Sequence, residues 1–317
     1  MSDFLAHGVT LALAWFAAAN ALASALVAIA ARRLVADTRA RTPGWWLMLR
    51  CLPAVASVAF VATVFVPSYL RFEPRETIEG FDLTLTLCAA AALVLLAMAA
   101  VRGACAWRRA AQQTVVWMRG AHPMRASGGV PVYTIGSAPA PLMALAGVAS
   151  PRVFVSERLV DALTEEELQA TLAHEASHVH SADNLKRLVM RLLPDALAGT
   201  AIAASMEQRW ASAAEHAADR AATAGDDDAR CALASALVKV ARLTPAATPP
   251  FEAISTLVGG GDLASRIESL LAEPRARTAS GRRLWTTVTL CGAAAIAYAP
   301  LLRAVHELTE VLVISLP

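Results

Sequence analysis

The sequence predicts a mainly α-helical membrane protein in which four transmembrane helices carry an inserted α+β domain. Two observations predict this class. First, 56% of the 317 residues are hydrophobic and 17% are charged, whereas soluble domains have about 25% charged residues. Second, four apolar runs are long enough to cross a bilayer, at residues 9–31, 46–66, 83–101 and 284–302.

The apolar runs divide the chain into three parts. Residues 1–101 hold the first three expected spans, residues 102–283 hold the inserted domain, and residues 284–317 hold the fourth span with a short tail. The first run lacks the features of a cleavable signal peptide, because Asp3 but no Lys or Arg precedes it and the run is too long. Aromatic residues mark several span ends, as expected at bilayer interfaces: Trp45, Trp46, Tyr69, Trp107, Trp285 and Tyr298.

Arginine positions predict the orientation of the spans, since cytoplasmic loops carry an excess of basic residues. The arginines concentrate after the first span, after the third and before the fourth: Arg32, Arg33, Arg39, Arg41, Arg102, Arg108, Arg109, Arg119, Arg275, Arg277, Arg282 and Arg283. We therefore expect a multi-pass protein of the bacterial inner membrane. Its N-terminus and C-terminal tail lie outside, and the inserted domain lies in the cytoplasm.

The same basic residues indicate which partners the protein contacts. Basic residues at membrane boundaries favour contact with the lipid bilayer over nucleic acid, and the net charge of +2 adds no strong field. We expect no nucleic-acid partner. The five cysteines show no Cys-x-x-Cys pattern and are interpreted as reduced apolar residues, not as a disulfide or metal set.

Local patterns predict the elements of the inserted domain. A helix is expected to continue from the third span over residues 104–118, and short strands are expected at 130–135 and 152–155. The stretch between the strands, residues 137–147, is rich in Pro and Gly and predicts a loop. Such strands could hold an extended peptide as an added strand, or could serve packing alone.

The next helix carries the most informative motif in the chain. It is expected from Glu165 to about Ser181, with Thr164 as N-cap and Glu167 in the capping-box position. Within it lies His174-Glu175-x-x-His178. Histidines at i and i+4 lie about 40° apart around a helix, so both rings can reach one metal ion.

Glu175 points in a neighbouring direction, where it can act as a base on a water molecule instead of binding the metal. A short pattern of this kind also occurs by chance in a solvated, alanine-rich helix. The surrounding sequence, with its helix start, favours the zinc interpretation.

A zinc site of this kind needs a third protein ligand, and Glu215 is the best candidate. It lies in an alanine-rich segment, residues 201–224, that contains no Pro and predicts a helix. Asp219 is i+4 from Glu215 and can accept a hydrogen bond from the free ring nitrogen of His174, which fixes the orientation of that ligand. The alternative is that these carboxylates form a solvated helix face.

The segment between the two ligand helices, residues 188–206, is apolar enough to resemble a span but contains Arg191, Pro194 and Asp195. A single crossing would place His174 and Glu215 on opposite sides of the bilayer. We therefore expect a buried or interface-lying helix here. Farther along, residues 243–262 are rich in Pro and Gly and predict a mobile loop, and a helix is expected at 263–271.

Taken together, the chain resembles the M56 family of membrane zinc metallopeptidases, which includes the β-lactam sensor-transducers. The resemblance covers the order of three spans, a metal domain and a fourth span, and is carried by these residues: Ser137, Pro139, Gly147, Pro151, the strand 153–155, residues 164–168, His174, Glu175, His178, Asp183, Glu215, Asp219, Leu263, Arg266 and Ile267. It implies a cytoplasmic gluzincin-type zinc peptidase domain. The M48 membrane proteases share both metal motifs but generally place spans between them.

The resemblance departs from the sensor-transducers in one respect. Those proteins carry a penicillin-binding domain after the fourth span, whereas this sequence ends at Pro317. We therefore expect the protease module without a built-in β-lactam sensor. We expect its activating signal to come from the spans, from the short outer loop, or from a separate sensor or regulator protein.

These observations predict an integral membrane zinc metalloendopeptidase acting on a cytoplasmic or membrane-proximal protein or peptide, in regulation or signal transduction, with self-cleavage as one option. His174, His178 and Glu215 would bind zinc, Glu175 would be the catalytic base, and Asp219 would orient His174. Tyr133 and His122 are considered as oxyanion donors, with structural roles as the alternative. His180 and His216 are interpreted as surface residues.

Three other functions are considered. One is an M48-like quality-control protease, and another is a zinc-bound signalling scaffold without catalysis. A structural zinc site usually has four ligands and has no use for a base such as Glu175, which argues against the scaffold. The third is a transporter or channel, which Arg50 near a span end would favour, but such arginines usually extend to the interface.

Overall fold

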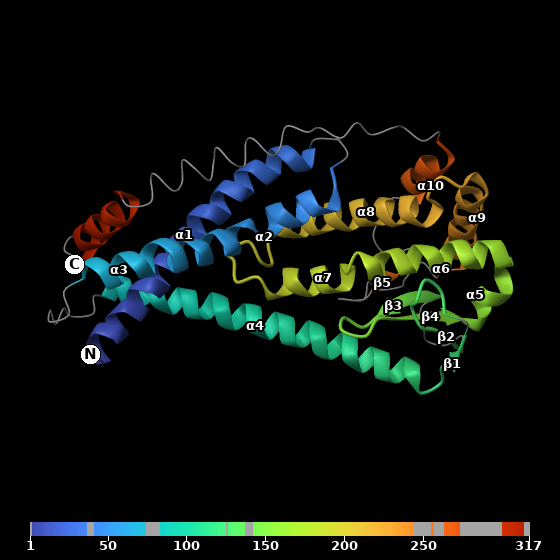
Figure 1. The fold of residues 1–317 in the computed structure, drawn as a ribbon, viewed down its shortest axis with the longest axis horizontal. Coiled ribbons are helices and arrows are strands. Elements are labelled where there is room, and N and C mark those ends of the chain that lie inside the picture. The colour runs from blue at the N-terminus through green and yellow to red at the C-terminus, as the bar shows by residue number, and fades with distance from the viewer. Residues whose placement is uncertain are drawn as a thin grey trace.

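The computed structural model describes residues 2–36, 41–73, 83–124, 126–136, 142–243, 255–256, 263–272 and 300–313. Most of these residues are helical. Figure 1 shows the N-terminal helices at one end of the molecule and a small sheet at the other, with the long helix α4 running between the two ends. The described residues therefore form a mostly helical protein with a small sheet, which agrees in part with the predicted fold class.

Among the residues that the structure describes, three helical stretches are long and apolar enough to span a membrane: Phe4–Leu34, Pro43–Phe72 and Leu83–Met118. They belong to α1 (Ser2–Ala36), to α2 (Pro43–Phe60) with the π-helical turn η1 (Val61–Phe65) and α3 (Val66–Phe72), and to α4 (Leu83–Met118). The wide turn η1 ends two residues before Pro67, which has no N–H to donate to the preceding turn. The first three predicted spans are thus confirmed as helices.

The predicted fourth span falls almost entirely outside the described residues. Residues 300–313 are helical and pack against α1 and α3. The Ser68 hydroxyl donates to the carbonyl of Leu302 at 2.7 Å, and Trp15 Nε1 donates to Thr309 Oγ1 at 3.1 Å.

The second half of α4 joins the membrane helices to the sheet. As predicted, this helix continues without a break to Met118. Trp117 near its end packs edge-on against Phe154, with ring centroids 5.5 Å apart, and Tyr133 stacks on the same ring at 5.8 Å. The inserted domain is therefore fixed to the membrane helices by an aromatic contact.

In the described part of the chain the sheet has five strands in the order β1-β2-β4-β3-β5, with β2 and β4 parallel and the other pairs antiparallel. Two of these strands confirm the sequence prediction: β2 (Val132–Ile135) and β4 (Arg152–Ser156). The remaining strands are β1 (His122–Pro123), β3 (Met143–Ala146) and β5 (Ser255–Thr256).

The prediction of a loop over residues 137–147 is wrong for its second half, which forms β3. Every residue of β3 is buried, so the strand shows no alternation of polar and apolar residues that sequence could reveal. Gly147 ends it with a φ of +94°, and a Cβ there would meet the backbone oxygen of Ser150. Residues 137–141 lie outside the described part of the chain.

Helices cover the sheet and carry the motif residues. The predicted helix starting at Glu165 is confirmed as α6, and both halves of its capping box are present, between Thr164 and Glu167. The predicted helix starting at Ala201 is also confirmed. The helices described in this domain are α5 (Glu157–Ala162), α6 (Glu165–His180), α7 (Asp183–Leu192), α8 (Ala201–Thr223), α9 (Asp227–Leu243) and α10 (Leu263–Leu271).

The core of the inserted domain lies between α6, α9 and the sheet. Leu168 and Leu172 of α6 meet Leu233 and Leu237 of α9, and β3 and β4 supply the opposite side. This packing holds one side of α6 against the sheet and α9. Helix α8 packs against the side of α6 that carries the histidines.

The prediction of one helix across residues 188–206 is wrong. Helix α7 ends at Leu192, residues 193–200 form a non-helical loop, and α8 begins at Ala201. Pro194 explains the break, since proline cannot donate to the preceding turn and disfavours helix at the residue before it. The predicted mobile loop at 243–262 lies outside the described residues apart from Leu243, which ends α9, and the two residues of β5.

Candidate metal centre

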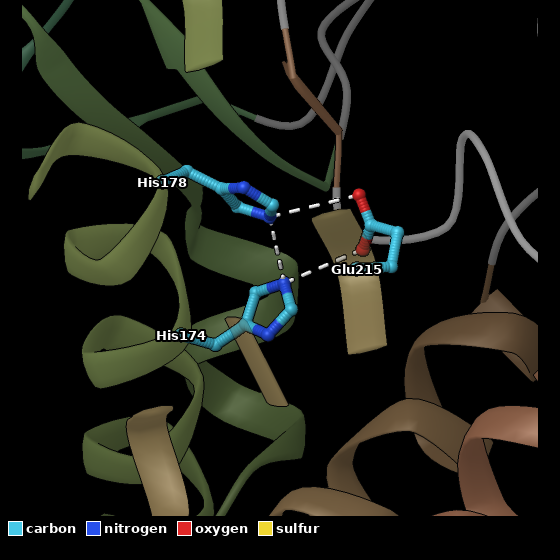
Figure 2. A group of neighbouring side chains, drawn as sticks. All are labelled: His174, His178 and Glu215. Carbon is cyan, nitrogen blue, oxygen red and sulfur yellow. Dashed lines mark hydrogen bonds and ion pairs between the residues drawn. The ribbon is translucent and has the colours of Figure 1, made fainter. Parts of the chain in front are cut away.

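Helices α6 and α8 bring the predicted ligands together (Figure 2). The Nε2 atoms of His174 and His178 are 3.1 Å apart. Oxygen Oε2 of Glu215 is 3.5 Å from Nε2 of His174, and Oε1 is 3.6 Å from Nε2 of His178. All three side chains are buried.

These distances fit a tetrahedral zinc site. Ligand atoms about 2.0–2.2 Å from zinc, at tetrahedral angles, lie roughly 3.3–3.6 Å from one another. The three measured separations fall close to this range. Two histidines and one carboxylate leave a fourth position open, which is the arrangement of catalytic zinc sites.

A carboxylate lies behind each ligand histidine. Nδ1 of His174 is 2.9 Å from Oδ1 of Asp219, and Nδ1 of His178 is 2.7 Å from Oδ2 of Asp183. When Nδ1 carries the proton toward a carboxylate, Nε2 presents its lone pair to the other ligands. Two buried lone pairs that face each other 3.1 Å apart repel unless a metal ion or a proton lies between them. The donor set therefore fits a metal ion.

Asp219 takes the position that the sequence predicts for it, while the role of Asp183 is new. Asp183 begins α7, five residues after His178, and Lys186 donates to its other oxygen at 3.0 Å. Sequence reasoning noted Asp183 only as part of a family resemblance. The signal that could have found it is an acidic residue one turn beyond the second histidine, just past the end of α6.

Arg266 is the second residue whose role sequence reasoning missed. It comes from α10, and its Nε and Nη2 contact the two oxygens of Asp219 at 2.8 and 2.7 Å. Its Nη1 lies 3.0 Å from Oε2 of Glu215. One buried guanidinium therefore fixes the ligand carboxylate and the carboxylate that orients His174. Nothing in the local sequence could show that α10 reaches this place.

Glu175 is fully buried, and neither of its carboxylate oxygens has a hydrogen-bond partner among the described residues. Burial raises the pKa of this carboxyl, and the neighbouring His174 and His178 oppose that rise. A buried carboxylate without hydrogen bonds costs stability. Such a cost is typical of a functional position, and here it lies beside the three candidate ligands.

The buried charged groups of the site shift one another's pKa values. Burial lowers the pKa of His174, but the carboxylates of Asp219 and Glu215 outweigh this and raise it to about 9. Burial raises the pKa of Asp219, but Arg266 and His174 lower it to about 2. The pKa of Glu215 is lowered by the two histidines despite its burial. Both acids are therefore carboxylates at neutral pH.

Residues 130–252 match the model of peptidase family M48. The match begins just before β2 and continues past α9, so it includes both ligand helices and the three strands β2, β3 and β4. Together with the apolar helices α1, α2 and α4, it supports a membrane metalloprotease. M48 peptidases are zinc-dependent, which agrees with the donor set. A comparison of the chain with curated proteins finds no matching sequence.

The other histidines and Tyr133 lie apart from this arrangement. Tyr133 stacks on Phe154, and His122 is an exposed residue of β1. His180 is exposed, as expected, with Nδ1 2.7 Å from the carbonyl of Ala176. His216 is half-buried and lies 3.3 Å from the hydroxyl of Ser265, so its interpretation as a surface residue is wrong.

Proposed function

We propose that this protein is a membrane-anchored zinc metalloendopeptidase. The observation that carries the proposal is Glu175, a buried carboxylate with no hydrogen bond to any described residue, beside a two-histidine, one-glutamate ligand set. This combination supports hydrolysis over a structural role, because a structural zinc site is usually closed by four ligands and needs no base.

The residues of the site have separate roles in metal binding and proton transfer. His174, His178 and Glu215 would hold zinc. When bound in such a site, zinc polarises the carbonyl of the scissile bond and lowers the pKa of water. Glu175 accepts the proton of the attacking water and returns it to the amine that leaves. A cation held next to Glu175 also favours its ionised form, which is the form that accepts a proton.

The neighbouring carboxylates and Arg266 keep these groups in place. Asp219 and Asp183 hold the Nδ1 sides of the two histidines, so each ring presents Nε2 as a ligand. Arg266 neutralises part of the negative charge that Asp219 and Glu215 would otherwise leave buried.

The arginine distribution supports a cytoplasmic position for the peptidase domain, in the bacterial inner membrane, with a protein or peptide substrate near the membrane surface. Three apolar helices before the domain, and a short loop instead of a span between α7 and α8, favour the arrangement of the M56 family. We infer a role in regulated proteolysis, with a separate protein supplying the signal.

A second candidate is quality control of membrane proteins, as an M48-like protease. The family match to residues 130–252 favours this candidate. Both candidates use the same residues and the same reaction, and they differ in the substrates that are cut.

Comparison of peptide fragments in cells that make the wild type or Glu175→Gln tests the proposal. We expect fragments that disappear in the variant, with both proteins present at equal levels in the membrane. The sequences of the fragments then separate a few regulatory cleavages from general degradation. His180→Ala, an exposed histidine on the same helix, is the matched control and should give the wild-type fragments. Identical fragments from wild type and Glu175→Gln would exclude a peptidase that uses this base.

A further inference from the structure

The loop between α7 and α8, residues 193–200, is held by polar side chains from the membrane helices. Asn20 of α1 is fully buried; its Nδ2 donates to the carbonyl of Pro194 at 2.8 Å, and its Oδ1 accepts from the N–H of Ala196 at 3.0 Å. Arg102 of α4 donates to the carbonyl of Leu193 at 2.9 Å. Two separate spans thus contact the backbone of one short loop.

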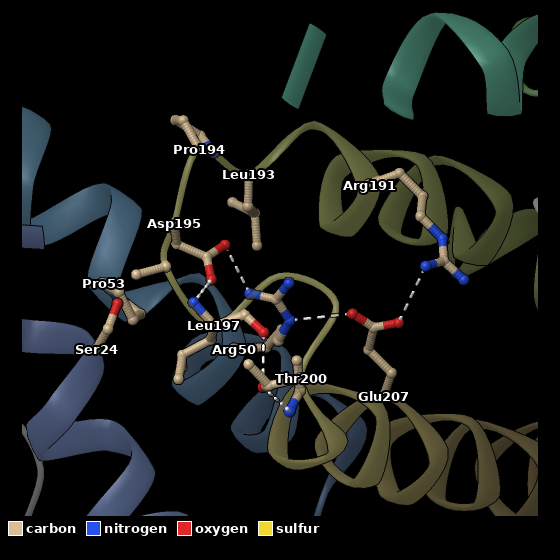
Figure 3. A network of polar contacts seen from close by, with 12 residues as sticks. Ser24, Arg50, Pro53, Arg191, Leu193, Pro194, Asp195, Leu197, Thr200 and Glu207 are labelled. Carbon is tan, nitrogen blue, oxygen red and sulfur yellow. Dashed lines mark hydrogen bonds and ion pairs between the residues drawn. The ribbon is translucent and has the colours of Figure 1, made fainter. Parts of the chain in front are cut away.

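The third contact comes from Arg50 of α2, and it also reaches α8 (Figure 3). Arg50 is 2% exposed. Its Nη1 lies 2.8 Å from Oδ2 of Asp195, and its Nε lies 3.0 Å from Oε1 of Glu207. Oδ1 of Asp195 accepts from the N–H of Leu197 at 2.9 Å. One guanidinium therefore joins a membrane helix, the loop and α8.

This finding corrects the expectation that Arg50 extends to the membrane interface. A buried guanidinium with two carboxylate partners is held in one geometry, because moving it away from both partners would leave a buried charge without compensation. The contact between Arg191 and Glu207 differs, since it is 3.7 Å long and Arg191 is 40% exposed. Arg50 therefore fixes α8 in a way that Arg191 does not.

The contact with Glu207 bears on the metal centre because Glu207 and Glu215 lie on the same uninterrupted helix. They are eight residues apart, which is about 12 Å along the axis. Apolar packing continues over this distance: Trp46 and Leu49 of α2 belong to one buried cluster with Trp210 and Ala214 of α8. Ala214 directly precedes Glu215.

The two ends of α8 are thus held by different parts of the molecule. Near its start, Glu207 contacts Arg50 of a membrane helix, and near its end, Asp219 contacts Arg266 of α10. Glu215 lies between these two contacts. A displacement of α2 relative to α6 would shift Glu215 relative to the two histidines.

We propose that Arg50 is a positioning residue for Glu215, through which the membrane helices set the geometry of the metal centre. The inference rests on the proposed zinc site but does not depend on which substrate is cleaved. The membrane helices then contact the helix that carries Glu215 directly. A signal that displaces α2 would change the affinity of the site for the metal without binding to the peptidase domain.

The test measures zinc affinity of the full chain, purified in detergent, by competition with a chelator. We expect Arg50→Met and Asp195→Asn to weaken zinc binding by about tenfold or more, as loss of a residue that supports a ligand does. The absorption spectrum of the cobalt-substituted protein should change in the same variants. Arg191→Met is the matched control and should stay within about twofold of wild type, since that contact is long and exposed.

The double variant Arg50→Met with Asp195→Asn separates a shared role from two independent ones. Because both residues act through one contact, we expect its zinc affinity to match that of the weaker single variant. Well-folded Arg50→Met protein with wild-type zinc affinity and an unchanged cobalt spectrum would overturn the proposal.

A further variant covers the case in which Arg50→Met does not fold. Glu207→Gln removes the contact with α8 and keeps the contact between Arg50 and Asp195. Its zinc affinity should fall several-fold, and wild-type affinity would overturn the proposal. A wild type that binds zinc but cleaves nothing would contradict the proposed function and leave this inference intact.

Discussion

Arg266 and Asp219 form a bidentate ion pair behind His174. Nε of Arg266 is 2.8 Å from Oδ2 of Asp219, and Nη2 of Arg266 is 2.7 Å from Oδ1. The carboxylate that orients a candidate ligand is therefore itself held by a helix that comes 47 residues later in the chain. The metal centre is assembled from α6, α7, α8 and α10, and its stability depends on contacts between these helices.

The first prediction concerns Arg266→Met. The substitution leaves the carboxylates of Asp219 and Glu215 buried with less positive charge nearby, and we expect a loss of about 3–5 kcal/mol in the metal-free protein. Bound zinc offsets part of this charge, so the loss should be smaller in the zinc-loaded protein. Thermal unfolding with and without a chelator measures both values. Arg220→Met, at an exposed position of α8, is the control. Equal losses in the two states would contradict the account.

The second prediction concerns the two carboxylates behind the histidines. Asp219→Asn and Asp183→Asn should each weaken zinc binding by about 10- to 100-fold, because the histidine rings lose the partners that fix their orientation. Chelator competition at fixed pH measures the affinity. Asp161→Asn, at an exposed position of α5, should bind zinc like the wild type. Unchanged affinity in Asp183→Asn would remove Asp183 from the site.

The third prediction concerns pH. In the metal-free protein Asp219 and Glu215 raise the pKa of His174 to about 9 from its ordinary 6.5, although burial opposes this. The folded value lies above the unfolded one. The stability that protonated His174 contributes is therefore fully present below pH 6.5 and is lost as the pH rises through about 9.

Zinc requires the neutral ring, so it must displace this proton. We expect zinc affinity to rise about tenfold per pH unit from neutrality to about pH 9, with close to one proton released from His174 for each zinc bound at pH 7.5. Calorimetry in buffers of different ionisation enthalpy counts the released protons. Zinc affinity that does not change over this range would show that His174 is already neutral.

The fourth prediction concerns Glu167, which connects the start of α6 to α9. Its carboxylate accepts from the N–H of Thr164 at 2.8 Å, from Ser235 Oγ at 2.6 Å and from Lys239 Nζ at 2.7 Å. Burial raises the pKa of Glu167, but these donors outweigh it and leave the pKa lowered. Its contribution to stability is therefore present above the unfolded pKa of about 4.5 and is lost as the pH falls through the lower folded value.

Glu167→Gln should destabilise the fold by about 1–3 kcal/mol at neutral pH, because a charged acceptor is lost. Zinc affinity of the folded protein should stay within a few-fold of wild type, since Glu167 lies two turns before His174. Glu165→Gln, at an exposed position of the same first turn, is the control. Denaturant unfolding at neutral pH and at pH 4 checks the size and the pH dependence of the loss.

Features that depend on nearby residues could be predicted from the sequence. The capping box at Thr164 and Glu167 and the spacing of His174 and His178 belong to a single helix, so local rules determine them. The apolar runs of the first three spans are equally local. The choice of Glu215 rested on the spacing of Glu215 and Asp219 in a predicted helix, and the requirement that Glu215 meet the two histidines then excluded a single span between them.

Features that depend on tertiary contacts could not be predicted. Strand β3 is buried on both faces and therefore lacks the period of two that identifies a half-buried strand. Arg266 and Arg50 are single arginines whose partners lie 47 and 145 residues away. Their roles depend on how helices pack, and no local pattern encodes that packing.

The most direct test of the central claim is the metal content of the purified protein. Elemental analysis should find one zinc ion per chain at the peptidase site in the wild type and in Glu175→Gln, and little zinc there in His178→Ala and Glu215→Ala. His306→Ala is the control, because Glu73, His306 and Glu310 form a separate group of neighbouring candidate ligands at the other end of the molecule. Its zinc content at the peptidase site should match the wild type. Zinc content that is the same in His178→Ala and Glu215→Ala as in the wild type would contradict the account.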